Sequence, residues 1–181
     1  MSDMRLRFST IVFVGLLFAV ALPAGAQMEM PKPAPELKKL DYFVGTWTSE
    51  GDTKPGPMGP GGKWTTTDRY QWMEGGFFLT GQTEYSGPEG KSKGPFFLGY
   101  DTNDKMFTYD AFSSMGEAGH AKGNLDGDTW TYTSDEKMGG QSFKSRYTMK
   151  ILSPTSYSMK YEMSKDGTNW TTVMEGKATK K

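Results

Sequence analysis

The 181-residue chain contains no cysteine and a single histidine, His120. Without cysteine it can form no disulfide, no thiolate nucleophile and no lipid anchor on a processed cysteine, so its stability must come from its core. A zinc site normally takes three or four ligands from Cys, His and carboxylates, and one histidine makes such a cage improbable. We therefore expect neither a bound metal nor a cofactor.

The chain also lacks an excess of either charge, because 21 basic residues balance 21 acidic ones. No basic run is longer than a pair such as Lys180-Lys181. Nucleic acids and anionic membranes attract proteins through clustered Lys and Arg. We therefore expect no nucleic-acid partner and no electrostatic membrane partner.

Long apolar runs are absent except for Ile11–Leu22, which is shorter than the roughly 20 residues that span a bilayer. Arg5 and Arg7 precede this run, and Ala24-Gly25-Ala26 follows it with the small residues that a signal peptidase requires. The pattern predicts a signal peptide cleaved after Ala26. We expect a periplasmic or secreted protein with no stable membrane insertion after cleavage.

The predicted organisation is a signal peptide over residues 1–26, a Pro-rich flexible leader over 27–35 and one domain over 36–181. Cleavage would leave about 155 residues, enough for one domain with a substantial core. The sequence does not indicate an oligomeric state.

What the chain has in abundance is Gly, Thr and aromatic residues, a composition that favours strands and tight turns. The clearest strands are two late segments in which apolar and polar residues alternate, as Tyr147 and Met149 do with Arg146 and Lys150. Such a period of two indicates one buried and one solvated face. Strands are expected near 43–50, 63–73, 77–86, 95–101, 105–113, 118–124, 128–134, 141–152, 155–164 and 170–178.

Short turns rich in Asp, Asn, Gly and Pro separate these strands, as in Leu125-Asp126-Gly127-Asp128, and they are typical of hairpins. About ten antiparallel strands in a meander would leave exposed edges unless the sheet closes. We predict an all-β fold, an antiparallel meander closed into a barrel of about ten strands. Pro35–Phe43 is expected to form a short helix that caps one end, and the Gly/Pro-rich loop Lys54–Gly62 a possible lid at the mouth.

Three segments in order resemble a known family: LDYFVGTW at 40–47, WMEGGFFL at 72–79 and LGYDTNDKMF at 98–107. The first, with its Gly-x-Trp, is similar to the opening of calycins, which include lipocalins, fatty-acid-binding proteins and nitrobindin-like barrels. Together the segments resemble the bacterial family called domain of unknown function 1579, from about Pro35 to the C-terminus. The resemblance implies a calycin-like β-barrel and brings no established activity.

Two features of calycins are not carried over to this chain. In lipocalins an Arg from a late strand covers the Trp of the motif, here Trp47, but the alternation places Arg146 on a polar face. In nitrobindin-like barrels a His near the C-terminus holds haem, and the last predicted strand contains no His. We therefore expect no haem.

A barrel of about ten strands is wider than the eight-stranded kind whose side chains just fill the interior, so part of the lumen should stay open. Inward aromatic and Met side chains suit a small hydrophobic or amphipathic ligand. The positions expected to contact it are Trp64, Tyr109, Phe112, His120, Trp130, Tyr147, Met149, Tyr161 and Met163.

Alternative chemistries find less support. His120 could act as a general base, but no nucleophile elbow accompanies it. Asp68, Glu84 and Asp110 lie in strands, where solvated outer-face positions are the default; an inward Asp110, beside Phe112, would anchor a ligand. The inward methionines could bind Cu(I), although filling the barrel explains them better.

The leading hypothesis is thus an exported, non-enzymatic barrel that binds a small hydrophobic or amphipathic ligand. A packed structural or interaction module that acts through its surface is the alternative, and a hydrolase or isomerase built on His120 or Asp110 is the third.

Overall fold

The computed structural model describes residues 31–56 and 59–181. The predicted signal peptide and the first residues of the predicted leader lie outside this range. Lys32–Lys181 forms one compact unit. No helix in the described part of the chain has the length and hydropathy needed to cross a membrane.

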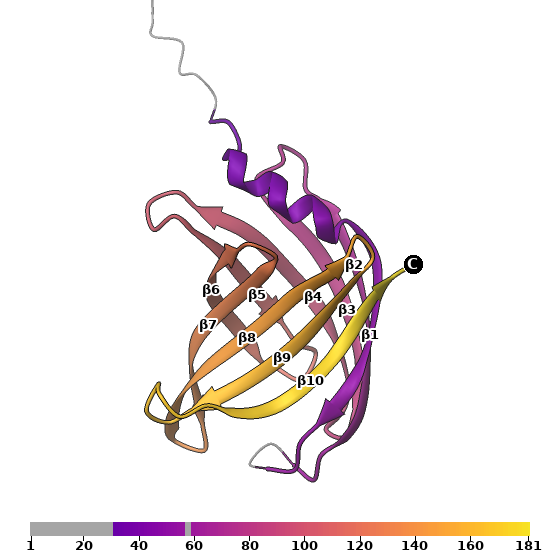
Figure 1. Ribbon diagram of the computed structural model, residues 1–181, viewed down its shortest axis with the longest axis vertical. Coiled ribbons are helices and arrows are strands. Elements are labelled where there is room, and N and C mark those ends of the chain that lie inside the picture. The colour runs from indigo at the N-terminus through magenta and orange to yellow at the C-terminus, as the bar shows by residue number, and fades with distance from the viewer. Residues whose placement is uncertain (1–30, 57–58) are drawn as a thin grey trace, which may run out of the picture. The chain divides into compact units, whose positions relative to one another are not determined.

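Ten antiparallel strands form a closed barrel in which each strand pairs with its neighbours in sequence and β1 pairs with β10 (Figure 1). The predicted all-β barrel is confirmed, although β4 begins earlier than expected, because Gly87 pairs with Gly90 across a tight turn. The strands are β1 (Gly45–Thr53), β2 (Gly62–Trp72), β3 (Leu79–Gly87), β4 (Gly90–Asp101), β5 (Met106–Phe112), β6 (Ala118–Asp126), β7 (Thr129–Met138), β8 (Gln141–Ser153), β9 (Ser156–Ser164) and β10 (Thr171–Lys180).

A 3-10 helix, η1 (Pro35–Phe43), covers one end of the barrel. Leu37, Leu40 and Phe43 are buried, and their spacing of three matches the three residues per turn of this helix. Contacts with the barrel hold it in place: the Tyr42 hydroxyl lies 3.1 and 3.0 Å from the carbonyl oxygens of Ser153 and Ser156. The predicted helix is confirmed, and its apolar side joins the core.

Trp47 of the Gly-x-Trp motif is fully buried beneath this helix. Its Nε1 donates to the Phe43 carbonyl at 2.7 Å, and its ring packs against Tyr157 at 5.0 Å between centroids. The cation over this Trp is Lys180 of β10, whose Nζ lies 5.6 Å from the ring centroid. Arg146 instead pairs with Glu162 on the polar face of the sheet, as the alternation predicted.

At the opposite end, the ring of Trp64 lies against two glycines of neighbouring strands. A Cβ at Gly176 would lie 2.6 Å from Trp64 Cζ2, and one at Gly51 would lie equally close. Any larger residue at either position would push the indole away. Trp64 therefore fills this end of the interior, while Trp47 and Trp130 fill the end near η1.

Candidate functional site in the barrel lumen

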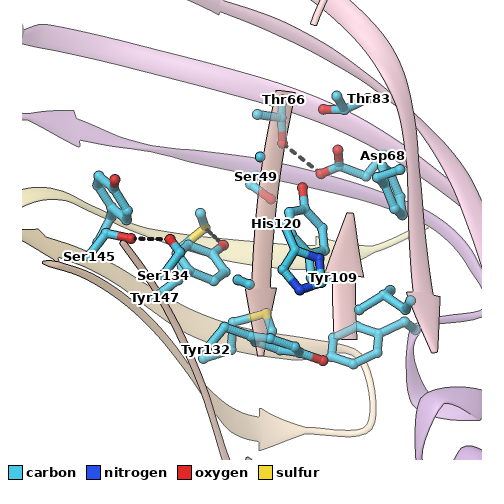
Figure 2. Close-up of a pocket in the computed structure, with 18 of the residues that line it drawn as sticks. Ser49, Thr66, Asp68, Thr83, Tyr109, His120, Tyr132, Ser134, Ser145 and Tyr147 are labelled. Carbon is cyan, nitrogen blue, oxygen red and sulfur yellow. Dashed lines mark hydrogen bonds between the residues drawn. The ribbon is translucent and has the colours of Figure 1, made fainter. Parts of the chain in front are cut away.

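Between these two packed ends the barrel encloses a cavity of about 310 Å³. Side chains from β1 to β9 and Phe43 of η1 line it, and aromatic rings form much of its wall (Figure 2). The lining includes six tyrosines, Tyr70, Tyr109, Tyr132, Tyr147, Tyr157 and Tyr161. The lumen is therefore aromatic, yet it carries several hydroxyl groups.

The tyrosine hydroxyls differ in how they are satisfied. The hydroxyl of Tyr147 lies 3.4 Å from the sulfur of Met159, and that of Tyr157 is hydrogen-bonded to Ser49 and Tyr70. The hydroxyl of Tyr132 has no partner among the described residues, although its side chain is only 3 % exposed. Burial raises the pKa of each of these phenols, so they remain neutral hydrogen-bonding groups.

Asp68 places a carboxyl group in this aromatic lumen. Thr66 Oγ1 donates to Asp68 Oδ2 at 2.8 Å, and Thr83 of β3 supplies a second hydroxyl contact. Burial raises the pKa of Asp68, while the two hydroxyl contacts oppose this rise. Asp68 was expected by default to lie on the solvated outer face, and this prediction was wrong. Thr66, Asp68 and Tyr70 of β2 all line the cavity.

Glu84, by contrast, is an outer-face acid, as expected. It pairs with Arg69 at 2.8 Å, and both side chains are more than half exposed. The guanidinium of Arg69 lowers the pKa of Glu84.

A second acid, Glu136 of β7, also lines the cavity. Ser134 donates to Glu136 Oε1 at 2.6 Å, and the hydroxyls of Ser134 and Ser145 are 2.6 Å apart. Glu136 was not predicted as a lumen residue, because the strand was expected to end near residue 134 and β7 continues to Met138. The alternation of Trp130, Tyr132 and Ser134 continues to Glu136 and could have placed it inside.

The barrel wall opens between β6 and β7. The ladder between these strands ends at Lys122↔Thr133, while β6 begins at Ala118 and β7 continues to Met138. The cavity is lined from both sides of this gap, by residues 119–121 on β6 and by Ser134 and Glu136 on β7. Because Gly119 and His120 are exposed, the cavity reaches solvent here.

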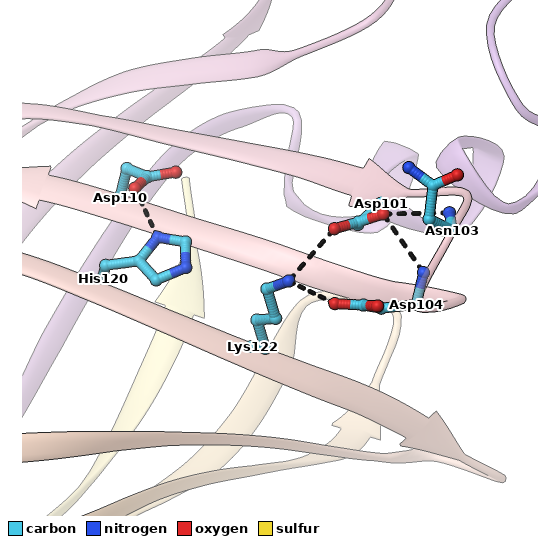
Figure 3. A network of polar contacts seen from close by, with 6 residues as sticks. All are labelled: Asp101, Asn103, Asp104, Asp110, His120 and Lys122. Carbon is cyan, nitrogen blue, oxygen red and sulfur yellow. Dashed lines mark hydrogen bonds and ion pairs between the residues drawn. The ribbon is translucent and has the colours of Figure 1, made fainter.

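The outer face beside this opening carries a polar network (Figure 3). His120 Nδ1 lies 2.6 Å from Asp110 Oδ1, and Lys122 Nζ contacts Asp101 at 3.0 Å and Asp104 at 2.5 Å. Asp110 pairs with His120 across the ladder, out of phase with the inward Tyr109 and Ala121. Asp110 therefore points outward, not into the lumen, and Phe112 lies on the same face.

The structure separates the nine predicted contact residues into two groups. Tyr109, Tyr147, Met149 and Tyr161 line the lumen, and His120 lies at its rim. The other four do not line it: Trp64 and Trp130 are buried in the packed ends, Phe112 is exposed, and Met163 lies beyond the cavity on β9. Whether the first group contacts a ligand stays a prediction. No described residue of the Lys54–Gly62 loop lines the cavity.

Comparison with solved structures supports this architecture. The crystal structure of Rv2717c from M. tuberculosis is similar at 14% sequence identity, with a TM-score of 0.55 over 83% of this chain and 99% of that one. The structure of EF1p2_mFAP2b bound to DFHBI is 13% identical, with a TM-score of 0.37 over 80% of this chain and 98% of that one. The first likeness shows a shared fold.

Comparison with curated proteins gives no match. A family model does match, over residues 32–180, and its description is "Protein of unknown function (DUF1579)". The chain belongs to this DUF1579 family.

Proposed function

We propose that the protein is an exported, non-catalytic binding protein that holds a small amphipathic molecule in its lumen. The observation that carries the proposal is the cavity of about 310 Å³, with aromatic walls and a few polar groups. Ligand sites typically have volumes of roughly 300–1,000 Å³ and this mixture of apolar surface and convergent polar groups.

The gap between β6 and β7 supports the proposal, because it gives a ligand a route to the lumen that does not require the packed ends to open. Its rim includes three small residues, Gly119, Ala121 and Ser134. A packed interaction module would need neither a cavity nor such a route. A catalytic role for His120 or Asp110 finds less support, since their paired side chains lie on the outer face.

Export is part of the proposal and rests on the signal-like segment over residues 1–26. A ligand would then be met in the periplasm or outside the cell. The N-terminal sequence of protein purified from its own host should begin at Gln27.

Native mass spectrometry of protein purified from its own host tests lumen binding. We expect a bound small molecule with the wild type, and its loss in Ala121→Trp, where an indole enters the cavity from the rim. Ala118→Trp is the matched control, because Ala118 pairs with Phe112 on the outer face of the same strand. Retention of the bound molecule by Ala121→Trp, or the failure of the wild type to bind any native or added molecule, would contradict the proposal.

A further inference from the structure

The charges that face the lumen all have the same sign. Asp68 and Glu136 line the cavity from opposite parts of the wall, on β2 and β7. Among the described residues that line it there is no Lys and no Arg. At the rim, the described residues include His120, whose ring already faces Asp110.

Each lumen acid is supported by hydroxyl groups and has no cation as partner in the part of the chain that the structure describes. Asp68 is contacted by Thr66 and Thr83, and Glu136 by Ser134 and Ser145. Hydroxyl groups orient a carboxylate but do not neutralise it. Asp68 is largely withdrawn from water, and a carboxylate in such a place without a positive partner is unfavourable, so a cation that enters the lumen relieves this cost.

The aromatic rings around Asp68 reinforce the same preference. Four tyrosines from four strands, Tyr70, Tyr109, Tyr147 and Tyr157, line the same cavity as Asp68. The negative face of an aromatic ring attracts cations, most strongly where water is excluded. Phe96, which packs at 4.7 Å from Tyr70 and 6.2 Å from Tyr109 between centroids, extends this aromatic wall.

We propose that the lumen selects small organic amines, with an aromatic or aliphatic body between the rings and an ammonium group beside Asp68, and that it rejects carboxylates of the same size. This inference rests on the proposed function, since it names the ligand class of the same cavity. No cluster of three or more His, Asp or Glu side chains suited to a metal ion occurs among the described residues, so an organic cation fits the lumen better than a metal ion.

Isothermal titration calorimetry with three probes that share an indole body tests the inference. Tryptamine carries an ammonium group, tryptophol a hydroxyl and indole-3-acetate a carboxylate. We expect tryptamine to bind at least about tenfold more tightly than tryptophol, the lower end for a hydrogen bond to a charged group, and indole-3-acetate to bind most weakly. The order of the three wild-type affinities therefore tests the inference by itself, even if a variant does not fold.

Substitutions then identify the side chains that cause the preference for tryptamine. Asp68→Asn keeps the shape of the side chain and should lower tryptamine affinity by roughly tenfold while leaving tryptophol binding nearly unchanged. Glu136→Gln should have a smaller effect in the same direction. Asp110→Asn, which changes an acid on the outer face, is the matched control and should change neither affinity.

The outcomes separate this inference from the proposed function. If all three probes bind equally, or if Asp68→Asn does not lower the preference for tryptamine, the lumen binds ligands but does not select amines. A neutral or anionic molecule found in the lumen by native mass spectrometry has the same meaning. If no probe binds and the native protein carries no molecule, both proposals fail.

Discussion

Replacing Tyr132 by Phe should make the folded protein more stable. The Tyr132 side chain is 3 % exposed, its ring lies parallel to that of Trp130 at 6.3 Å, and its hydroxyl has no partner among the described residues. Burial of a hydroxyl without a hydrogen bond costs about 1–3 kcal/mol. Because Tyr132→Phe removes only this oxygen and keeps the ring contacts, we expect the free energy of unfolding to rise by about 1 kcal/mol.

Tyr42→Phe is the matched control, since it makes the same chemical change at a hydroxyl that is hydrogen-bonded. The Tyr42 hydroxyl lies 3.0 Å from the Ser156 carbonyl oxygen, so its loss should lower the free energy of unfolding by about 1 kcal/mol. Urea unfolding followed by tryptophan fluorescence measures both changes, provided that the m value stays constant. In a thermal scan each shift should be roughly 2–4 °C, with opposite signs.

If Tyr132→Phe destabilises the protein as much as Tyr42→Phe does, the Tyr132 hydroxyl is not an unsatisfied group and this prediction is refuted. A linked prediction concerns binding, because Tyr132 lines the lumen. If that hydroxyl is retained for a ligand, the more stable variant should bind tryptophol more weakly, by roughly fivefold for one neutral hydrogen bond. A substitution that raises stability and lowers affinity is the trade-off expected at a binding site.

Two further predictions concern the opening and the buried acid. Ala121 and Ser134 lie next to the last ladder pair, Lys122↔Thr133, so the double variant Ala121→Cys, Ser134→Cys should form a disulfide that closes the gap. In stopped-flow measurements the oxidised protein should then bind tryptamine more slowly than the reduced protein. Equal association rates would place the route elsewhere. Burial raises the pKa of Asp68 above its ordinary 3.8, so the folded state holds the carboxyl proton more tightly than the unfolded state does. The free energy of unfolding of the wild type should therefore fall as pH rises from about 3.8 through the pKa of Asp68 in the folded state. Asp68→Asn has no proton to lose at this position, so its free energy of unfolding, measured with urea, should rise relative to that of the wild type as pH rises over the same window. A difference that does not change with pH would show that Asp68 does not titrate as described.

The sequence predicts the fold well because the signals for it are local. Alternation along 141–152 and 155–164 and the turn residues between strands determine a meander, and a meander of ten strands has unpaired edges unless it closes. The observed β1–β10 pairing is that closure. Strand ends are less predictable, since β1 continues through Asp52 to Thr53 by pairing with β2 and β10, and those contacts are not local.

The site is harder to predict, for two physical reasons. Alternation shows which face a residue occupies only where the two faces differ, and along Thr65-Thr66-Thr67-Asp68 every residue is polar. Position along the barrel axis is set by register, so Trp64 and Trp130 point inward and yet fill the ends instead of the cavity wall. The parity of β8, where apolar and charged residues alternate, did place Tyr147 and Met149 correctly in the lumen lining.

The opening that gives access to the lumen also leaves two strand edges without ladder partners in the described structure, and such edges favour association between chains. The edge on β7 carries Asp135, Glu136 and Lys137 in succession, and Asp135 is held by Lys144 of β8 at 2.9 Å. The facing edge on β6 is short. Pairing with another chain would desolvate these charges, so they oppose edge-to-edge association while the gap stays open to a small molecule. Glu136 therefore has two roles, because the same side chain that faces the lumen also belongs to the charged segment that protects the edge.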